Sequence, residues 1–380
     1  MTGLQRNAGG FFYIVGANSL HCCVIRANAS VGNAWVGEAW LGIGKQRDFA
    51  AHCLHMVRVG IQESVAEQLL RDFPVEAEIV RLPRQPERSY EVDFWIPPFS
   101  RKAVETFLPH LHGVKVVQSL MAGVDWLLPA LPPGLTVCDG RGIHDVPTSE
   151  LVLTLVLASL KRLPLYLGNQ RESKWDGQKA FGGGMAAQEQ TTGALYAGQM
   201  NVLSDELCGR TVLIVGYGSI GAAIEARLKP FDVHVLRVAR SARTGVASIA
   251  ELPQLLPQAD VVVLIVPHTP ETRGMFGAEQ MALMKPGALL INAARGPVVV
   301  TDALVTALQQ GRIHAAVDVT DPEPLPPGHP LWAAPNCIIT PHVGGSTPGF
   351  ITRAYALAAA QLHRYVKGEP LENIVSESGY

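Results

Sequence analysis

The sequence lacks the features that mark three classes of protein. No apolar run reaches the ~18 residues needed for a membrane-spanning helix, so we expect no membrane partner. The formal net charge is −2 and no basic block stands out, so we expect no nucleic-acid partner. The six cysteines show neither metal-ligand spacing nor a disulfide framework. We therefore expect no metal site, and a reducing, cytoplasmic location.

The chain does contain a long alternation of strand and helix patterns. Its 380 residues suit two domains, and 48% apolar with 17% charged residues suits an α/β enzyme with buried strands. We predict two doubly wound Rossmann-like domains with a cleft between them. Residues 56–146 with 344–380 form the expected substrate-binding domain, and residues 147–343 form the expected dinucleotide-binding domain. In the first domain, Ser64–Phe73 has the apolar spacing of a helix.

Two stretches depart from this alternation. Residues 1–55 are rich in glycine and alanine and show no sustained apolar period. A secretory signal there is weak, because Asn18 and His21 interrupt its apolar run. We expect a poorly ordered N-terminal extension, with Met56 as the start of the folded part. Residues 177–203, rich in Gly, Ala and Gln, are expected to form a loop or insertion.

The run Val215–Gly221 is the most informative motif in the chain. It follows a strand pattern at Thr211–Ile214 and precedes a helix pattern at Ala222–Leu228, the context in which GxGxxG predicts dinucleotide binding. The glycines permit a tight turn, close approach of the backbone to a pyrophosphate, and close packing of helix on strand. The alternative is a βα turn that binds nothing. The expected cofactor contacts in this loop are Gly216, Tyr217, Gly218, Ser219, Ile220 and Gly221.

A carboxylate is missing at the place where an NAD enzyme would use one. The second strand pattern, Val233–Val238, is followed by Ala-Arg-Ser-Ala-Arg rather than by the Asp or Glu that binds a ribose 2′-hydroxyl. Arg240, Ser241 and Arg243 can instead bind a 2′-phosphate, because a guanidinium donates hydrogen bonds in pairs. We therefore predict NADP(H) as the cofactor. The alternative is a solvated basic loop.

Three further residues stand at the C-terminal ends of strand patterns in the second domain. Arg295, at a Gly-Pro turn, can clamp a substrate carboxylate and polarise the adjacent carbonyl. Glu323 lies between two prolines, and His342 precedes a glycine pair. A carboxylate beside a histidine favours the imidazolium and fixes its tautomer, so that it can serve as a general acid. Taken singly, these residues could be an ion-paired arginine, a solvated carboxylate and a structural histidine. Together they match the reduction of a 2-keto acid.

From about Val57 to the C-terminus, these motifs resemble the D-isomer-specific 2-hydroxyacid dehydrogenase family. The resemblance rests on Val215–Gly221, Val266–Thr272, Asn292–Gly296, Asp318–Pro326, His329–Trp332 and Pro341–Thr347. It implies that Arg295 binds the substrate, that Glu323 is the carboxylate partner and that His342 is the acid/base. It also implies that backbone N–H groups of Ala122 and Gly123 hold the substrate carboxylate.

The resemblance extends to the cofactor and to assembly. The positions that match cofactor-lining residues of the family are Thr148, Pro267, Thr272, Ala293, Asp318 and Gly344. The long apolar helix pattern that starts at Thr148 resembles the family's dimerisation arm. The resemblance therefore implies a homodimer.

Within the family, Ala239–Arg243 resembles the NADP-using glyoxylate/hydroxypyruvate reductases. The expected reaction is the NADPH-dependent reduction of a small 2-keto acid to the D-2-hydroxy acid. A formate dehydrogenase is disfavoured because that branch has Gln where Glu323 stands. An NAD-dependent phosphoglycerate-type dehydrogenase is disfavoured by the arginine-rich loop, and because only 38 residues follow His342 we expect no regulatory domain. A nucleotide-sensing protein like the family's corepressor relatives is the alternative from another class.

Overall fold

The computed structural model describes residues 3–6, 12–15, 56–175 and 205–375 of the 380-residue chain. Segment 177–203, expected to be a loop or insertion, lies outside these residues, as does most of the expected N-terminal extension. Within that extension, β1 (Gly3–Arg6) and β2 (Phe12–Val15) pair antiparallel as a two-stranded sheet.

The larger of the two main sheets has seven strands, and each neighbouring pair is parallel. Its spatial order is β12-β11-β10-β13-β14-β15-β16. The chain leaves central β10 for β11 on one side and later for β13 on the other, so the topological switch point lies beside β10. The strands are β10 (Thr211–Val215), β11 (His234–Ala239), β12 (Ala247–Ser248), β13 (Val261–Leu264), β14 (Leu289–Asn292), β15 (His314–Val317) and β16 (Cys337–Ile339).

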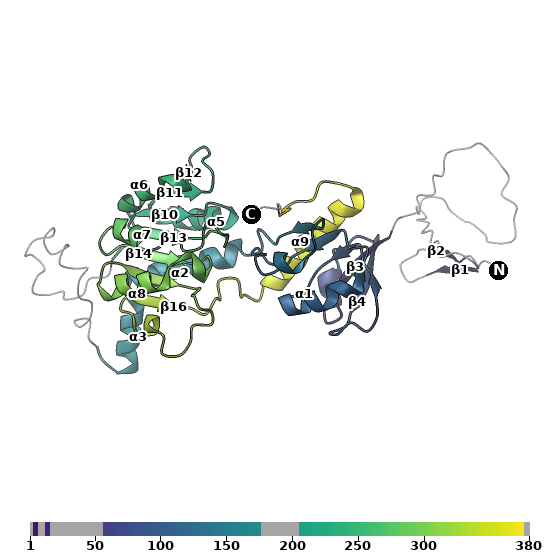
Figure 1. Cartoon of the computed structure of the whole chain (residues 1–380), viewed down its shortest axis with the longest axis horizontal. Helices are drawn as coiled ribbons and strands as arrows, with labels where there is room; N and C mark the ends of the chain where they lie inside the picture. Colours follow the sequence, from purple (N-terminus) through teal and green to yellow (C-terminus); the bar gives the residue numbers. More distant parts are fainter. Residues whose placement is uncertain (1–2, 7–11, 16–55, 176–204, 376–380) are drawn as a thin grey trace, which may run out of the picture.

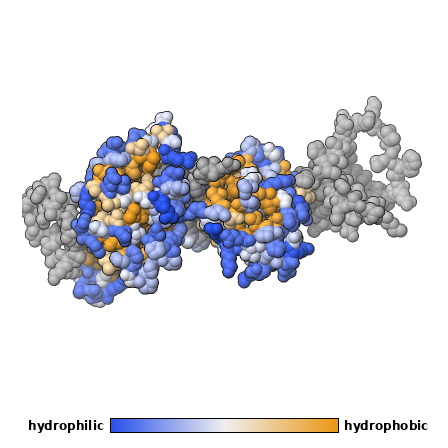
Figure 2. Space-filling view, in the orientation of Figure 1, coloured by the Kyte–Doolittle hydropathy of each residue, from blue (hydrophilic) through white to orange (hydrophobic). Residues whose placement is uncertain are grey.

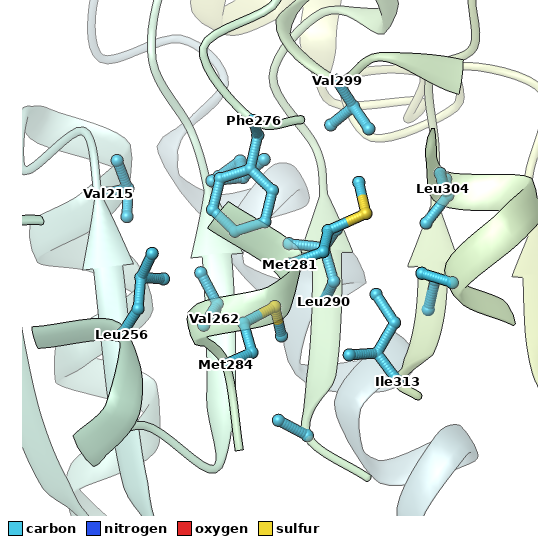
Figure 3. Close-up of a cluster of buried hydrophobic side chains, with 14 of the residues drawn as sticks. Val215, Leu256, Val262, Phe276, Met281, Met284, Leu290, Val299, Leu304 and Ile313 are labelled. Carbon is cyan, nitrogen blue, oxygen red and sulfur yellow. The ribbon is translucent and has the colours of Figure 1, made fainter. Parts of the chain in front are cut away.

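The central strands form because short runs of β-branched and apolar residues are buried on both faces. Val212–Val215 and Val261–Leu264 are buried throughout. On one face, Leu290 and Val262 pack with Phe276 from the loop regions that cover the sheet, as Figure 3 shows. Burial of a Val, Leu, Ile or Phe side chain contributes about 1.5–3 kcal/mol, so this core is a main source of stability for the edge that carries the site.

Helices cover both faces of this sheet (Figure 1). On the face opposite Phe276, α2 and α5 share a core with β10, β13 and β14. The helix expected from Thr148 begins at Asp145, with Pro147 in its first turn, where the missing N–H of proline costs no helical hydrogen bond. The helices of this domain are α2 (Asp145–Leu160), α3 (Leu163–Arg171), α5 (Ser219–Leu228), α6 (Leu252–Leu255), α7 (Ala278–Leu283) and α8 (Thr301–Gln309).

The second main sheet has five parallel strands in the order β4-β3-β6-β8-β9. α9 (Phe350–Lys367) returns to it from the end of the chain, and Ala358 and Leu362 share a core with Val59 and Phe94. α1 (Arg101–Phe107) packs in the core on the other face. The strands are β3 (Val57–Gln62), β4 (Ala77–Leu82), β6 (Phe94–Trp95), β8 (Val116–Gln118) and β9 (Thr136–Cys138), with β5 (Tyr90–Glu91) and β7 (Leu111–His112) as a separate parallel pair.

The prediction of two doubly wound α/β domains is confirmed. The two bodies lie side by side, with α9 in yellow packed on the smaller one (Figure 1). The visible surface of both is largely hydrophilic, and hydrophobic residues gather on the smaller body next to the junction between the domains (Figure 2).

The predicted helix at Ser64–Phe73 is wrong, because only a single 3-10 turn, η1 (Glu67–Leu70), forms there. The amide of Leu69 bonds the carbonyl of Ala66, three residues before it, rather than that of Val65, and the Val65 carbonyl accepts a hydrogen bond from Arg81 of β4. The other 3-10 turns are η2 (Leu108–His110), η3 (Leu128–Ala130), η5 (Lys229–Phe231), η6 (Ile249–Glu251), η7 (Leu256–Gln258), η8 (Gly296–Val298) and η9 (Pro330–Ala333).

Among the described helices, none is by itself long and apolar enough to cross a membrane. The pair α2 and α3 would pass such a test together by length and composition, but the two are bent by 69° at their junction. α2 also contributes Val152 and Val156 to the core of the larger domain.

Candidate active site

The glycine loop begins where β10 ends, at the switch point of the larger sheet. Gly216 has a φ of +108°, and a Cβ there would lie 2.5 Å from the carbonyl oxygen of Ile265. A Cβ on Gly221 would lie 2.8 Å from the carbonyl oxygen of Gly216. Backbone geometry therefore requires both glycines, one for the turn and one for the close packing of α5.

Packing within the chain does not require glycine at position 218, because a Cβ there would meet no atom within 4 Å. It is exposed, and it precedes the ten-residue helix α5, whose N-terminus has no side-chain cap. The first N–H groups of a helix have no partner within the helix, and its dipole favours an anion at that end. Open space in front of an uncapped helix start fits the pyrophosphate of a dinucleotide.

The residues predicted to bind a 2′-phosphate lie beside this loop. Arg240, Ser241 and Arg243 are exposed and follow β11, which is the direct neighbour of β10. The guanidinium of Arg243 donates a hydrogen bond to the carbonyl oxygen of Tyr217 in the glycine loop. The two predicted parts of the cofactor site are therefore in contact.

His342 and Glu323 are also brought together. Nδ1 of His342 lies 2.6 Å from Oε1 of Glu323, and the two side chains are 43% and 42% exposed. Because Glu323 engages Nδ1, Nε2 is the ring nitrogen left to exchange a proton with a ligand. Pro322 and Pro324 restrict the backbone on both sides of Glu323.

Asp318, predicted to line the cofactor, has its carboxylate engaged within the turn that carries His342. The residue is 3% exposed. Oδ1 accepts hydrogen bonds from Thr340 Oγ1 at 2.6 Å and Val343 N at 2.9 Å, and Oδ2 accepts one from Gly344 N at 2.9 Å. The amide of His342 donates to the Asp318 carbonyl at 2.7 Å. These bonds hold His342 at a φ of +54°, which non-glycine residues seldom adopt.

Arg295 extends from the end of β14 to the smaller domain. Its Nη2 lies 3.5 Å from Oδ1 of Asp125, and a Cβ on Gly123 would lie only 1.8 Å from the same nitrogen. The predicted substrate arginine therefore packs against the predicted substrate loop, which also contains Ala122. With 29% of its side chain exposed, Arg295 remains accessible to a small anion.

Asn292, the last residue of β14, has a structural role that the sequence did not indicate. It is 1% exposed, and its Nδ2 donates to the carbonyl of Arg295 at 3.2 Å while its Oδ1 accepts from Ala294 N at 3.1 Å. Asn292 therefore fixes the turn from which Arg295 projects. The available signal was that Asn292 is the one polar residue in the strand Leu-Leu-Ile-Asn.

The remaining predicted cofactor residues divide into two groups. Thr148 and Gly344 meet at the junction between the domains, where Thr148 Oγ1 donates to the carbonyl of Gly344 at 3.3 Å. Thr272 and Pro267 belong to the loop after β13, where Thr272 Oγ1 donates to the Pro267 carbonyl at 2.7 Å. Ala293 directly follows β14 and is half-buried.

His144 is a second residue near the site that the sequence did not single out. It is 8% exposed, stacks on Phe350 with ring centroids 5.1 Å apart, and has no hydrogen-bond partner for either ring nitrogen among the described residues. Burial, with smaller effects of the charges on Arg295, Arg353 and His342, lowers the pKa of His144 to about 4. The ring is therefore neutral at neutral pH, and it adds no charge to the cationic region around Arg295. No sequence pattern marked it.

Taken together, the site brings an accessible guanidinium near an imidazole that is paired with a carboxylate. Arg295, Glu323 and His342 follow β14, β15 and β16, which are consecutive neighbours in the sheet. The loops touch, since a Cβ on Gly296 would lie 1.9 Å from the carbonyl oxygen of Thr320. An arginine that binds a carboxylate beside a histidine that can protonate a carbonyl oxygen suits a keto acid.

Comparison with known proteins points in the same direction. The family model described as "D-isomer specific 2-hydroxyacid dehydrogenase, NAD binding domain" matches residues 153–344, just over half of the chain. A human glyoxylate reductase/hydroxypyruvate reductase is 34% identical over 279 residues, which are 68% of this chain and 76% of the human protein. A D-3-phosphoglycerate dehydrogenase from Methanocaldococcus jannaschii is 29% identical over 334 residues, and the chain spans 58% of that protein's length.

Solved structures show the same similarity. An NADPH-dependent glyoxylate/hydroxypyruvate reductase from Sinorhizobium meliloti, in complex with NADP and sulfate, matches with a TM-score of 0.69 at 26% identity. The match covers 85% of this chain and the whole of that one. A D-isomer specific 2-hydroxyacid dehydrogenase from Xanthobacter autotrophicus, in complex with NADPH, matches with a TM-score of 0.64 at 28% identity over 85% of this chain and 98% of the other.

Replacing His342 with alanine tests its role as the proton donor. We expect His342→Ala to lower kcat for keto-acid reduction by about 10²- to 10⁴-fold, the usual contribution of a positioned general acid. Circular dichroism and the thermal midpoint should stay near those of the parent, because His342 is exposed. Near-normal turnover by a folded variant would remove His342 from the mechanism.

Replacing Gly123 with alanine tests whether Arg295 and the loop form one substrate site. The added methyl would displace the guanidinium of Arg295, so we expect KM for the keto acid to rise about 10-fold or more with cofactor affinity unchanged. Gly277→Ala is the matched control, because its methyl would meet only ordinary contacts at 3.6 Å. An unchanged KM in Gly123→Ala would show that Arg295 does not bind the substrate from this position.

Proposed function

Because the chain belongs to the D-isomer-specific 2-hydroxyacid dehydrogenase family, we propose that it reduces a small 2-keto acid of the glyoxylate or hydroxypyruvate type to the D-2-hydroxy acid with NADPH. The observation that carries this proposal is the 2.6 Å contact between His342 and Glu323, on loops that adjoin Arg295. The homologous reductases from human and Sinorhizobium meliloti support the substrate class. We place the reaction in the cytoplasm.

In this proposal the substrate carboxylate is held from both domains. The guanidinium of Arg295 binds it from the larger domain, and backbone N–H groups of Ala122 and Gly123 bind it from the smaller one. Asp125, 3.5 Å from the guanidinium, orients Arg295 without closing off its remaining N–H donors. Two-sided binding fixes the C2 carbonyl in one orientation, which is what a single stereochemical product requires.

In this proposal the proton and the hydride come from different groups. His342 donates a proton from Nε2 to the carbonyl oxygen, while Glu323 at Nδ1 stabilises the imidazolium before the transfer. When bound, the nicotinamide supplies the hydride that C2 receives. The Asp318 network keeps His342 at a fixed backbone angle, so the donor nitrogen stays in place through the step.

NADPH use is supported by the absence of a carboxylate after β11 and by the exposed Arg240, Ser241 and Arg243 in its place. The glycine loop and the uncapped start of α5 would hold the pyrophosphate. The solved relatives in complex with NADP or NADPH agree with this choice.

A spectrophotometric assay tests the reaction and the cofactor together. We expect NADPH to be oxidised faster than NADH, at limiting cofactor concentration, with glyoxylate or hydroxypyruvate. Phenylpyruvate and phosphohydroxypyruvate are the comparison substrates, the second because of the phosphoglycerate dehydrogenase relative. Preference for NADH would contradict the cofactor assignment, and preference for phosphohydroxypyruvate would contradict the substrate assignment. Tight NADPH binding without turnover on any keto acid would favour a sensor.

We also propose that the chain forms a homodimer through the end of α2 and through α3. Leu163 and Leu167 on α3 are 47% and 52% exposed, an arrangement typical of an apolar surface that a partner covers. Most of α2, by contrast, packs within its own domain.

Charged substitutions on α3 test this assembly by light scattering after size exclusion. The parent should elute as a dimer, and Leu163→Asp with Leu167→Asp should give a folded monomer, because burying two carboxylates without partners is unfavourable. Val75→Asp is the control, since Val75 is 75% exposed on the smaller domain and should leave the dimer intact. A dimer that survives the double substitution would place the interface elsewhere.

A further inference from the structure

Tyr217, the second residue of the glycine loop, has two guanidinium groups over its ring. The Cζ atoms of Arg237 and Arg243 lie 5.7 Å and 5.8 Å from the ring centroid. Such distances are within the range of cation–π attraction. Tyr217 thus contacts one arginine of β11 and one arginine of the segment that follows β11, and the two differ in what else they bind.

The charge of Arg237 is compensated within the domain. Its Nε donates to Oε2 of Glu225 at 2.6 Å, its Nη2 pairs with Oε1, and the hydroxyl of Tyr217 donates to the same carboxylate at 2.5 Å. The bond from Arg237 is the main reason that the pKa of Glu225 is lowered, so this carboxylate is ionised at neutral pH. Arg237 is therefore a structural cation, with its charge matched by Glu225.

Arg243 is held by neutral groups. Its guanidinium donates to the carbonyl oxygen of Tyr217 and lies over the Tyr217 ring. Its backbone is fixed by two hydrogen bonds with Val246, at 3.0 Å and 2.8 Å, across a turn that contains Gly245. None of these contacts carries a negative charge, and Arg243 is exposed. The residue is positioned, and these contacts leave its charge uncompensated.

Arg240 directly follows β11, three residues before Arg243, and it is also exposed. The guanidinium of Arg243 contacts both the carbonyl oxygen and the ring of Tyr217. Arg243 is therefore held at the glycine loop, where the phosphate of a dinucleotide would approach.

We propose that Tyr217 sets the preference for the 2′-phosphate by presenting Arg243 to it, and that Arg243 rather than Arg240 is the main phosphate ligand. This proposal rests on the proposed use of NADPH. Tyr217 acts as a positioning residue: its ring and its carbonyl hold the guanidinium beside the loop, so less side-chain freedom is lost when the phosphate binds. Glu225 contributes by compensating the charge of Arg237, so that Arg237 competes less with Arg243 for the anion.

Equilibrium binding of NADPH and NADH, measured by calorimetry without keto acid, tests the proposal. We expect Arg243→Ala to weaken NADPH binding about 10- to 100-fold and Arg240→Ala to weaken it clearly less, with NADH binding little changed in both. Tyr217→Leu removes the ring and should reduce the ratio of the two dissociation constants about 3- to 10-fold. Tyr217→Phe keeps the ring and the carbonyl, and it should restore most of the preference.

The outcomes separate this proposal from the one on which it rests. A parent protein that binds NADPH and NADH equally would contradict NADPH use itself. A parent that prefers NADPH, with Tyr217→Leu retaining the full ratio, would overturn the role of Tyr217 and leave NADPH use standing. A larger loss in Arg240→Ala than in Arg243→Ala would overturn the choice of ligand. The Arg243→Ala substitution is at an exposed residue, so the identity of the phosphate ligand is tested even if Tyr217→Leu does not fold.

Discussion

The hydrogen bonds to the buried Asp318 carboxylate are the constraint on which the rest of the site depends. A carboxyl group at 3% exposure is tolerated only when its oxygens have hydrogen-bond partners, and here three donors from the turn after β16 supply them. The same bonds hold His342 at its left-handed backbone angle and place Gly344 against Thr148 of α2. His342, proposed as the proton donor, Gly344, predicted to line the cofactor, and the contact of Gly344 with Thr148 are therefore all held by the Asp318 carboxylate.

The Asp318 hydrogen bonds are one of three local restraints that together build the site from three separate loops. β14, β15 and β16 lie side by side, and each is followed by a turn whose conformation is restrained by its own hydrogen bonds or prolines. Hydrogen bonds of Asn292 hold the turn of Arg295, prolines restrict the backbone around Glu323, and hydrogen bonds of Asp318 hold the turn of His342. The sheet sets the spacing of the three side chains, and these local restraints set the directions in which they project. A parallel sheet is suited to this, because all its strands end at the same edge.

Much of this could be predicted from the sequence, and the failures have physical causes. Strands such as Val261–Leu264 are readable because they are buried on both faces and so consist of apolar residues alone. That Arg295, Glu323 and His342 would lie at one edge of the sheet could be predicted because each follows a strand and has Pro or Gly beside it. At the predicted helix Ser64–Phe73 only a 3-10 turn forms, and the Val65 carbonyl there bonds Arg81 of β4, a partner that the local apolar spacing does not record. The buried stack of His144 on Phe350, and the engagement of the Asp318 carboxylate, depend on contacts across long sequence separations, which no local pattern records.

The return of α9 to the smaller sheet bears on how the chain is made. Val59 of β3 and Leu362 of α9 share one core, so the smaller domain cannot complete its interior until the whole larger domain has been synthesised. The larger sheet has no such requirement, because its strands run from Thr211 to Ile339 before α9 is reached. During synthesis the face of the smaller sheet that α9 covers would therefore stay exposed until α9 is made. Exposed apolar surface of this kind favours aggregation until α9 covers it.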